Sequence, residues 1–266
     1  MDYINRPNVY ITAKDDPTKN PDWLLSNYGI PDNNGRSEGA VIIIHVDKSD
    51  IVGPGVSDVF YFFFYSFNLG NKVFFRRYGN HVGDWEHTMI RFKDGKPEYV
   101  YVSQHAFGSA YNYSCLEMIG QRPVVFSAIG THGMYVTEGA HHYTRLGPLL
   151  GDHTGRGPLW DPTLNYLSFD FSKNEGFTQY ENNSAPTSFL RFAGRWGDKK
   201  YPDSDPRQYH FLTEYAWSSG PTGPIAKNLL RLEVCQTLRG DDCIILNDRD
   251  KIYIEEAEED ILDQNV

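Results

Sequence analysis

The segment 59–67 constrains the fold more than any other part of this 266-residue chain. It reads Val-Phe-Tyr-Phe-Phe-Phe-Tyr-Ser-Phe, and aromatic and β-branched residues favour strands. Because successive side chains of a strand point to opposite faces, aromatic residues at consecutive positions occupy both faces. We therefore predict a strand that is covered on both sides by other parts of the protein.

Further strands are predicted over 40–46, 84–92, 99–105 and 123–129, with a turn at 94–97 and a short helix after Asn20 and Pro21. Residues 229–235 and 243–246 fit a late hairpin, whereas 224–232 also fits a helix. The Gly-, His- and Asp-rich stretch 130–198 indicates long ordered loops that carry function. The expected fold is mainly β, a β-sandwich with long decorating loops and a few short helices. Without repeats or composition breaks, 1–266 forms a single domain in which 1–8 and 255–266 are peripheral or frayed.

The overall charge and hydropathy exclude some classes of partner. The net charge of -10 argues against nucleic acid, because phosphate binding needs a clustered basic surface. No apolar run approaches the roughly 20 residues of a membrane-spanning helix, and the first residues lack the apolar core of a signal peptide. The oligomeric state stays open. Cys235 and Cys243 flank a predicted turn, and a local disulfide and two free buried thiols are both consistent with that spacing.

The segment 79–87, Gly-Asn-His-Val-Gly-Asp-Trp-Glu-His, carries the candidate chemistry. Strand alternation places Asp84 and Glu86 on one face and Trp85 and His87 on the other. The preceding glycine-rich turn can direct His81 back toward the carboxylates. Two crowded, partly buried carboxylates repel by on the order of a few kcal/mol unless a cation or a proton lies between them. We therefore predict a divalent-cation site, favoured over a metal-free cluster.

The donor types indicate which metal is expected. Zinc sites use Cys and several His in spacings such as His-Glu-x-x-His, which this sequence lacks. Two carboxylates and one imidazole suit Ca²⁺ or Mg²⁺, which we expect ahead of Mn²⁺, Zn²⁺ or iron. An iron site would additionally require His105 or His132.

Several other polar and aromatic residues lie at predicted strand ends or in the long loops. His105 and His132 follow predicted strands and are candidate acid/base groups. The candidate lining of a ligand pocket comprises Trp85, His141, His142, Asp152, Trp160 and Asp161.

Motifs spread along the chain resemble a known family. The segments 61–68, 79–87, 103–105, 130–132 and 159–162 together resemble the fungal vacuolar protein sorting-associated protein 62 family, over about 9–198. Residues 133–136 and 141–143 depart from the usual family pattern. The resemblance implies a vacuolar or secretory route; a cytoplasmic location is the alternative.

A second resemblance bears on the site. The run 81–86, His-Val-Gly-Asp-Trp-Glu, is similar to the heptapeptide of necrosis- and ethylene-inducing peptide-like proteins. Those proteins are β-sandwiches, and the similarity implies that His81, Asp84 and Glu86 are ligands of a divalent cation. Asn68 is the nearest counterpart of the upstream acidic ligand in that family.

Three hypotheses of function follow. The first is a cation-assisted binding protein for a small polar ligand, such as a sugar or lipid headgroup. The second is a metal-assisted enzyme, a hydrolase or a lyase or cyclase, that uses His105 or His132 as acid or base. The third is a structural adaptor in protein sorting. The sequence does not decide whether the protein is an enzyme.

Overall fold

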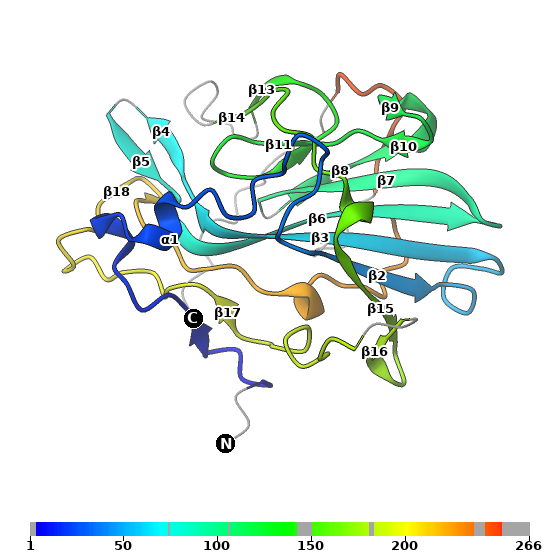
Figure 1. Cartoon of the computed structure of the whole chain (residues 1–266), viewed down its shortest axis with the longest axis horizontal. Coiled ribbons are helices and arrows are strands. Elements are labelled where there is room, and N and C mark those ends of the chain that lie inside the picture. The colour runs from blue at the N-terminus through cyan, green and yellow to red at the C-terminus, as the bar shows by residue number, and fades with distance from the viewer. Residues whose placement is uncertain are drawn as a thin grey trace.

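The computed structural model describes residues 4–73, 75–105, 107–142, 151–180, 184–236 and 243–251. The prediction of a mainly β fold is confirmed, and an eight-stranded sheet runs through the centre of the molecule (Figure 1). Its strand order is β16-β15-β2-β3-β6-β7-β8-β20. Neighbouring strands are antiparallel except for the pairs β15–β2 and β20–β8. The strands of this sheet are β2 (Val41–Asp47), β3 (Val56–Asn68), β6 (His81–Lys93), β7 (Lys96–Gln104), β8 (Phe107–Asn112), β15 (Tyr166–Ser172), β16 (Gly176–Gln179) and β20 (Ile245–Leu246).

Six two-stranded ribbons and a few short helices complete the described part of the chain. The ribbons pair β1 (Tyr10–Ile11) with β17 (Arg195–Trp196), β4 (Asn71–Val73) with β5 (Arg76–Tyr78), β9 (Met118–Ile119) with β10 (Arg122–Pro123), β11 (Phe126–Ser127) with β12 (Met134–Tyr135), β13 (Gly139–His142) with β14 (Gly151–Thr154), and β18 (His210–Phe211) with β19 (Glu214–Tyr215). The helices are α1 (Asp22–Leu25), η1 (Pro17–Lys19), η2 (Tyr113–Cys115), η4 (Pro162–Leu164) and η5 (Pro224–Ala226). The predicted short helix near the start is α1.

Both faces of the large sheet are buried, as the aromatic run in β3 predicts. Phe60 and Phe62 pack into one core together with Met89 of β6. Phe63 packs into a second core on the opposite face, together with Val102 of β7. Each fully buried Phe contributes about 1.5–3 kcal/mol to folding. The pattern of β3 therefore fixes the two-sided burial of the whole sheet.

The layers that cover the two faces of the large sheet are made of small elements in the described residues. In the described residues, ribbons and loops cover the eight-stranded sheet on its two faces. The stretch 130–198, predicted as loops, also supplies β15 and β16 to the large sheet. Its alternating apolar residues, Leu167, Phe169 and Phe171, are the signal for β15. The parallel partner of β15 is β2, more than one hundred residues earlier, which local patterns do not reveal.

Two predicted strands are also corrected. In place of one strand over 123–129 there are two short ones, because Arg122–Pro123 pairs with β9 and Phe126–Ser127 pairs with β12 in separate ribbons. The late hairpin is absent within the described residues, since β20 pairs with β8. Cys235 and Cys243 form a disulfide, which decides between the two alternatives for these thiols.

The structure describes only part of the two ends that the sequence predicts to be peripheral. Residues 1–3 and 255–266 of the predicted peripheral ends lie outside the described residues, and the single-domain organisation stays a prediction. Among the residues that the structure describes, no helix has the length and apolar character needed to cross a membrane.

Candidate functional site

The two carboxylates of the motif lie side by side on one face of β6. In the pairing of β6 with β3, Asp84 is opposite Tyr65 and Glu86 is opposite Phe63. Both acidic residues are buried, with 5% and 4% of their surface exposed. Strand alternation therefore places the two acids as the sequence predicts.

Trp85 lies on the other face of β6. There it packs in the first core, with its ring edge-on to Phe62 at 6.3 Å and to Trp196 at 5.5 Å. Trp85 therefore does not line the carboxylate site, and its assignment to the ligand pocket is corrected. The reason is the same two-residue period that brings Asp84 and Glu86 together.

Gly83 allows the chain to turn so that His81 reaches the same polar region. Its φ of +69° is in the left-handed region, and an added Cβ would lie 2.4 Å from the Trp196 carbonyl oxygen. His81 donates from Nδ1 to the Gly83 carbonyl at 2.6 Å, which leaves its Nε2 as the basic nitrogen. Burial lowers the pKa of His81, with the nearby Asp84 carboxylate opposing, so neutral imidazole is favoured.

Asp84 is held by a histidine from a distant loop. His132 Nδ1 lies 3.2 Å from Asp84 Oδ2, and the His132 ring stacks on Tyr65 with 3.8 Å between ring centroids. Trp160 packs edge-on against Tyr65 at 6.3 Å. Trp160, one of the predicted pocket residues, therefore contacts Tyr65, which is the residue opposite Asp84.

Glu86 has a strongly perturbed titration. Burial raises its pKa well above 4.5, the charge of Asp84 raises it further, and a hydrogen bond from Ser103 Oγ and the charge of Lys227 oppose the rise. The same Ser103 hydroxyl accepts the His87 backbone N–H at 2.8 Å. Glu86 therefore has a raised affinity for a proton, or for another positive charge that reaches it.

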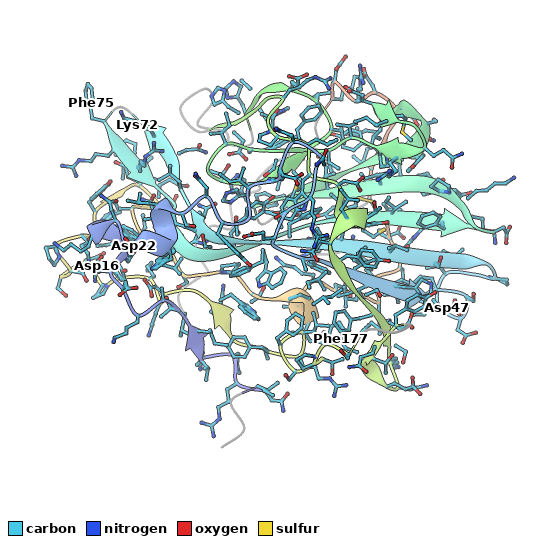
Figure 2. All side chains as sticks on the ribbon, in the orientation of Figure 1. Asp16, Asp22, Asp47, Lys72, Phe75 and Phe177 are labelled. Carbon is cyan, nitrogen blue, oxygen red and sulfur yellow. A yellow bond between two sulfur atoms is a disulfide. The ribbon has the colours of Figure 1, made fainter. Side chains whose placement is uncertain are left out.

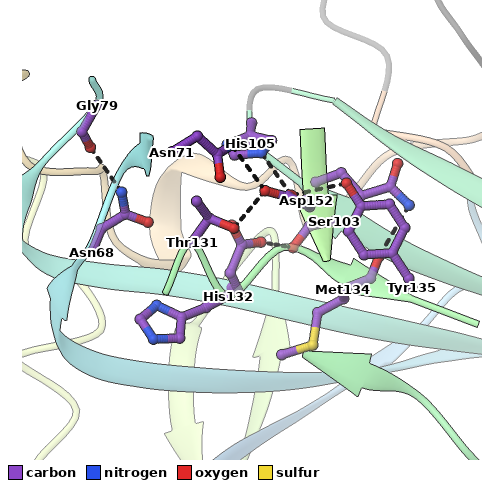
Figure 3. A network of polar contacts seen from close by, with 12 residues as sticks. Asn68, Asn71, Gly79, Ser103, His105, Thr131, His132, Met134, Tyr135 and Asp152 are labelled. Atoms are coloured by element: carbon purple, nitrogen blue, oxygen red, sulfur yellow. Dashed lines mark hydrogen bonds and ion pairs between the residues drawn. The ribbon is translucent and has the colours of Figure 1, made fainter. Parts of the chain in front are cut away.

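Asp152 forms the centre of a second polar cluster beside the first (Figure 3). Its fully buried carboxylate accepts hydrogen bonds from His105 Nε2 at 2.8 Å, Thr131 Oγ1 at 2.6 Å and Tyr135 at 2.9 Å. Burial raises the pKa of Asp152, but the hydrogen bond and charge of His105 and the two hydroxyl donors outweigh burial and lower it. Asp152 is therefore a stable anion that orients His105.

The two clusters share one region of the molecule. Two short segments bridge them: Thr131 donates to Asp152 while the next residue, His132, contacts Asp84, and Ser103 donates to Glu86 while His105, two residues on, contacts Asp152. His105 and His132 also have φ values of +56° and +62°. Non-glycine residues adopt this conformation infrequently, at a cost of about 1–3 kcal/mol, and such residues cluster at functional sites.

The remaining predicted residues have more peripheral positions. The His141 ring stacks on Tyr135 with 3.9 Å between ring centroids, and His141 also contacts Thr154. His141 therefore packs against one of the residues that donate to Asp152. Asn68 pairs with His81 across the strands and donates to the Gly79 carbonyl at 2.7 Å, shaping the turn.

His142 and Asp161 have other surroundings: His142 pairs with Gly151 across β13 and β14, and Asp161 contacts Thr163 and Arg122. The His142 residue is exposed on β13. Asp161 caps η4 by accepting the Thr163 N–H and forms an ion pair with Arg122 at 2.6 Å. Their assignment to the ligand pocket therefore stays a prediction.

The structure adds groups that the sequence did not single out. Ser103, Thr131 and Tyr135 supply the hydroxyls that hold Glu86 and Asp152. Tyr65 was recognisable in principle, because it lies on the same face as Asp84 in the adjacent strand. Glu214 lies near His105, whose charge opposes the rise in Glu214 pKa caused by burial.

The donors are engaged with one another in this conformation. Within the described ranges, no group of three or more His, Cys, Asp or Glu side chains is arranged to hold a metal ion. Asp84 is paired with His132, and Glu86 with Ser103. Joint coordination would therefore require these side chains to exchange partners.

Comparison with known proteins identifies the family. The vacuolar protein sorting-associated protein 62 family matches residues 33–151, a span that contains Asp84, Glu86, His105 and His132. Two curated proteins of Saccharomyces cerevisiae are similar over 255 residues: putative vacuolar protein sorting-associated protein TDA6 at 38% identity and vacuolar protein sorting-associated protein 62 at 36%. The chain belongs to the vacuolar protein sorting-associated protein 62 family.

The similarity to these family members extends over most of the chain but not over most of the relatives. The aligned region covers 88% of the chain and 54% of the first relative, and 89% and 54% for the second. The chain thus spans about half the length of the curated relatives it matches. No solved structure matches it.

Proposed function

We propose that the Asp84–Glu86 site binds a divalent cation, Ca²⁺ or Mg²⁺, and through it a small polar ligand such as a sugar or a lipid headgroup. The observation that carries this proposal is the pair of buried carboxylates on one face of β6. Their burial and mutual repulsion favour uptake of positive charge, as the raised pKa of Glu86 indicates. A hard cation with oxygen ligands meets that requirement.

The neighbouring histidine fits the same proposal. A metal-binding imidazole commonly donates its other N–H to a backbone carbonyl, and His81 makes such a bond to Gly83. Burial favours its neutral form, which is the form that binds metals. Asp84, Glu86 and His81 would hold the ion, and Asn68 lies next to them. A bound ion would supply positive charge and exchangeable positions for ligand oxygens.

A second candidate is a metal-assisted hydrolase, lyase or cyclase. It is favoured by one specific observation: His132 and His105 are each paired with a buried carboxylate, Asp84 and Asp152. A histidine oriented in this way can remove a proton from a hydroxyl group and return it to a leaving group. In this proposal His105 is a better placed base than His132. The partner of His105 is Asp152, whereas the partner of His132 is Asp84, one of the two carboxylates that would hold the ion.

The names of the relatives suggest a cellular setting. Both refer to vacuolar protein sorting, and we propose that this chain also acts on a vacuolar route. A small-molecule, glycan or lipid-headgroup ligand is the expected partner, rather than nucleic acid.

Calorimetric titration of chelator-treated protein with CaCl₂ and with MgCl₂ tests the cation proposal. We expect saturable binding to the parent and loss of binding in Asp84→Asn and Glu86→Gln. The matched control is Asp170→Asn, because Asp170 is also paired with a histidine, His45, at 2.8 Å but lies outside the site. Absence of binding to the parent, or equal loss in the control, would contradict the proposal.

The two candidate functions separate at His105. In the binding protein, His105→Gln should leave cation affinity and ligand affinity within a few-fold of the parent. In the enzyme, the same variant should bind cation normally but lose turnover of any hydrolysable substrate, and the residual activity should no longer rise with the pKa of a general base on the acidic limb of the pH profile. His142→Gln is the control, because the His142 side chain is exposed on β13.

A further inference from the structure

The β4–β5 hairpin presents an aromatic side chain to solvent at one end of the molecule. Phe75 lies in the turn between β4 and β5 and is 92% exposed, more than any other large hydrophobic side chain in the described residues. Figure 2 shows Phe75 and Lys72 at the outer end of this hairpin, away from the large sheet. Lys72, Arg76 and Arg77 are exposed beside it. The hairpin that carries Phe75 therefore also carries three exposed cationic residues, on a chain of net charge -10.

The hairpin is firmly attached at its base. Tyr209 accepts the Arg77 N–H at 3.2 Å and donates to the Arg77 carbonyl at 2.9 Å. The guanidinium of Arg76 lies 4.7 Å from the centre of the Tyr209 ring, and Tyr78 packs edge-on against that ring at 5.5 Å. The exposed position of Phe75 is therefore held by specific contacts at the base of the ribbon.

An open groove runs along the same hairpin. It has a volume of about 370 Å³, and its lining includes Phe67, Leu69, Phe75, Arg76, Arg77 and Trp217. The lining contains two arginines and no acidic side chain. In Figure 2, Asp16 and Asp22 lie below the hairpin, and Asp16 is paired with Arg207 at 3.2 Å. The groove and the hairpin thus present apolar and positively charged groups together.

We propose that this surface docks onto an anionic lipid bilayer. The Phe75 ring would enter the boundary between headgroups and acyl chains, where burial of an aromatic side chain is favourable. Lys72, Arg76 and Arg77 would lie at the level of the anionic headgroups, and each cation near such a surface strengthens binding about fivefold. The proposal does not depend on the cation site, because it uses different residues.

Vesicle flotation tests this proposal with the full chain. We expect binding to phosphatidylcholine vesicles that contain about one-third phosphatidylserine, and weak binding to phosphatidylcholine alone. High salt should weaken the binding. Phe75→Ser should lower the partition coefficient about tenfold or more, and Lys72→Gln about fivefold.

Two control variants match these changes away from the hairpin. Ile119→Ser alters an exposed apolar residue of β9, and Lys96→Gln removes an exposed cation at the start of β7, next to the far end of β6. Both should bind like the parent, and thermal unfolding should verify that all four variants are folded. Failure of the parent to bind anionic vesicles, or equal binding by Phe75→Ser and Ile119→Ser, overturns the proposal. If the chain binds another protein through this hairpin but does not bind the vesicles, the proposal is also overturned.

Discussion

Replacing Glu86 with Gln should stabilise the protein near neutral pH when no cation is present. Successive side chains on one face of a strand lie about 6.7 Å apart. At an effective dielectric constant of about 20, two like charges at about that separation repel by about 2.5 kcal/mol. Glu86→Gln removes this repulsion from Asp84 while its amide oxygen can still accept the Ser103 hydrogen bond.

The pH dependence has a definite sign. The pKa of Glu86 is raised from 4.5, first by burial and then by Asp84. A carboxyl group with a raised pKa contributes stability that is present below its unfolded pKa and is lost as pH rises through its folded pKa. The parent should therefore lose stability relative to Glu86→Gln as the pH rises through the folded-state pKa of Glu86, which lies above 4.5.

Urea unfolding followed by tryptophan fluorescence measures this difference. Below the folded-state pKa of Glu86 the two proteins should be similar, and above that pKa the variant should be more stable by about 2.5 kcal/mol from the repulsion alone. For a chain of this size that corresponds to a melting temperature higher by about 5–10 °C. Saturating Ca²⁺ or Mg²⁺ should stabilise the parent and leave the variant unchanged, which reduces or reverses the difference.

A matched variant and a clear contrary result complete the design. Glu98→Gln changes an exposed glutamate of β7 and should show no such pH-dependent gain. If Glu86→Gln is less stable than the parent at pH 8 without cations, the carboxylates do not repel as proposed. The cation site would then lose its physical basis.

Three further changes test other parts of the structure. Asp58→Ala leaves two buried cations, Lys48 and Arg91, without their carboxylate and should cost about 3–5 kcal/mol in urea unfolding; a loss below 1 kcal/mol would contradict this. Gly83→Ala should lower stability by at least about 1–3 kcal/mol, because of its positive φ and a close backbone contact; full stability with normal cation binding would show that the turn is not required. Reduction of the Cys235–Cys243 disulfide should cost about 2.5 kcal/mol through loop entropy, measured as a lower melting temperature with reductant; an unchanged value would refute it.

The sequence predicts the centre of the site because its information there is local. A two-residue period suffices to place Asp84 and Glu86 on one face of β6, opposite Tyr65 and Phe63 of β3. The aromatic run in β3 likewise predicts burial on both faces, because six consecutive aromatic residues leave neither face polar.

The partners of the carboxylates depend on topology. His132 reaches Asp84 from 48 residues away, and Asp152 reaches His105 from 47 residues away. No local period encodes these contacts. Their strand-end positions predict a shared polar region, but the same reasoning also includes His142, which is exposed, and Asp161, which pairs with Arg122.

The missed strands have a related cause. Leu167, Phe169 and Phe171 alternate as a strand requires, but the surrounding residues are typical of loops. The strand is completed by parallel pairing with β2 from a distant part of the chain. Long-range pairing of this kind depends on the assembled sheet and not on the segment alone.

An anomalous difference map from crystals soaked in Mn²⁺ tests the central proposal most directly. Mn²⁺ accepts the same oxygen and imidazole ligands as the proposed Ca²⁺ or Mg²⁺. We predict a peak between Asp84 and Glu86, with His81 Nε2 as a ligand and with His132 moved away from Asp84. A map with no peak there, in which His132 still contacts Asp84 and Ser103 still contacts Glu86, would contradict the account.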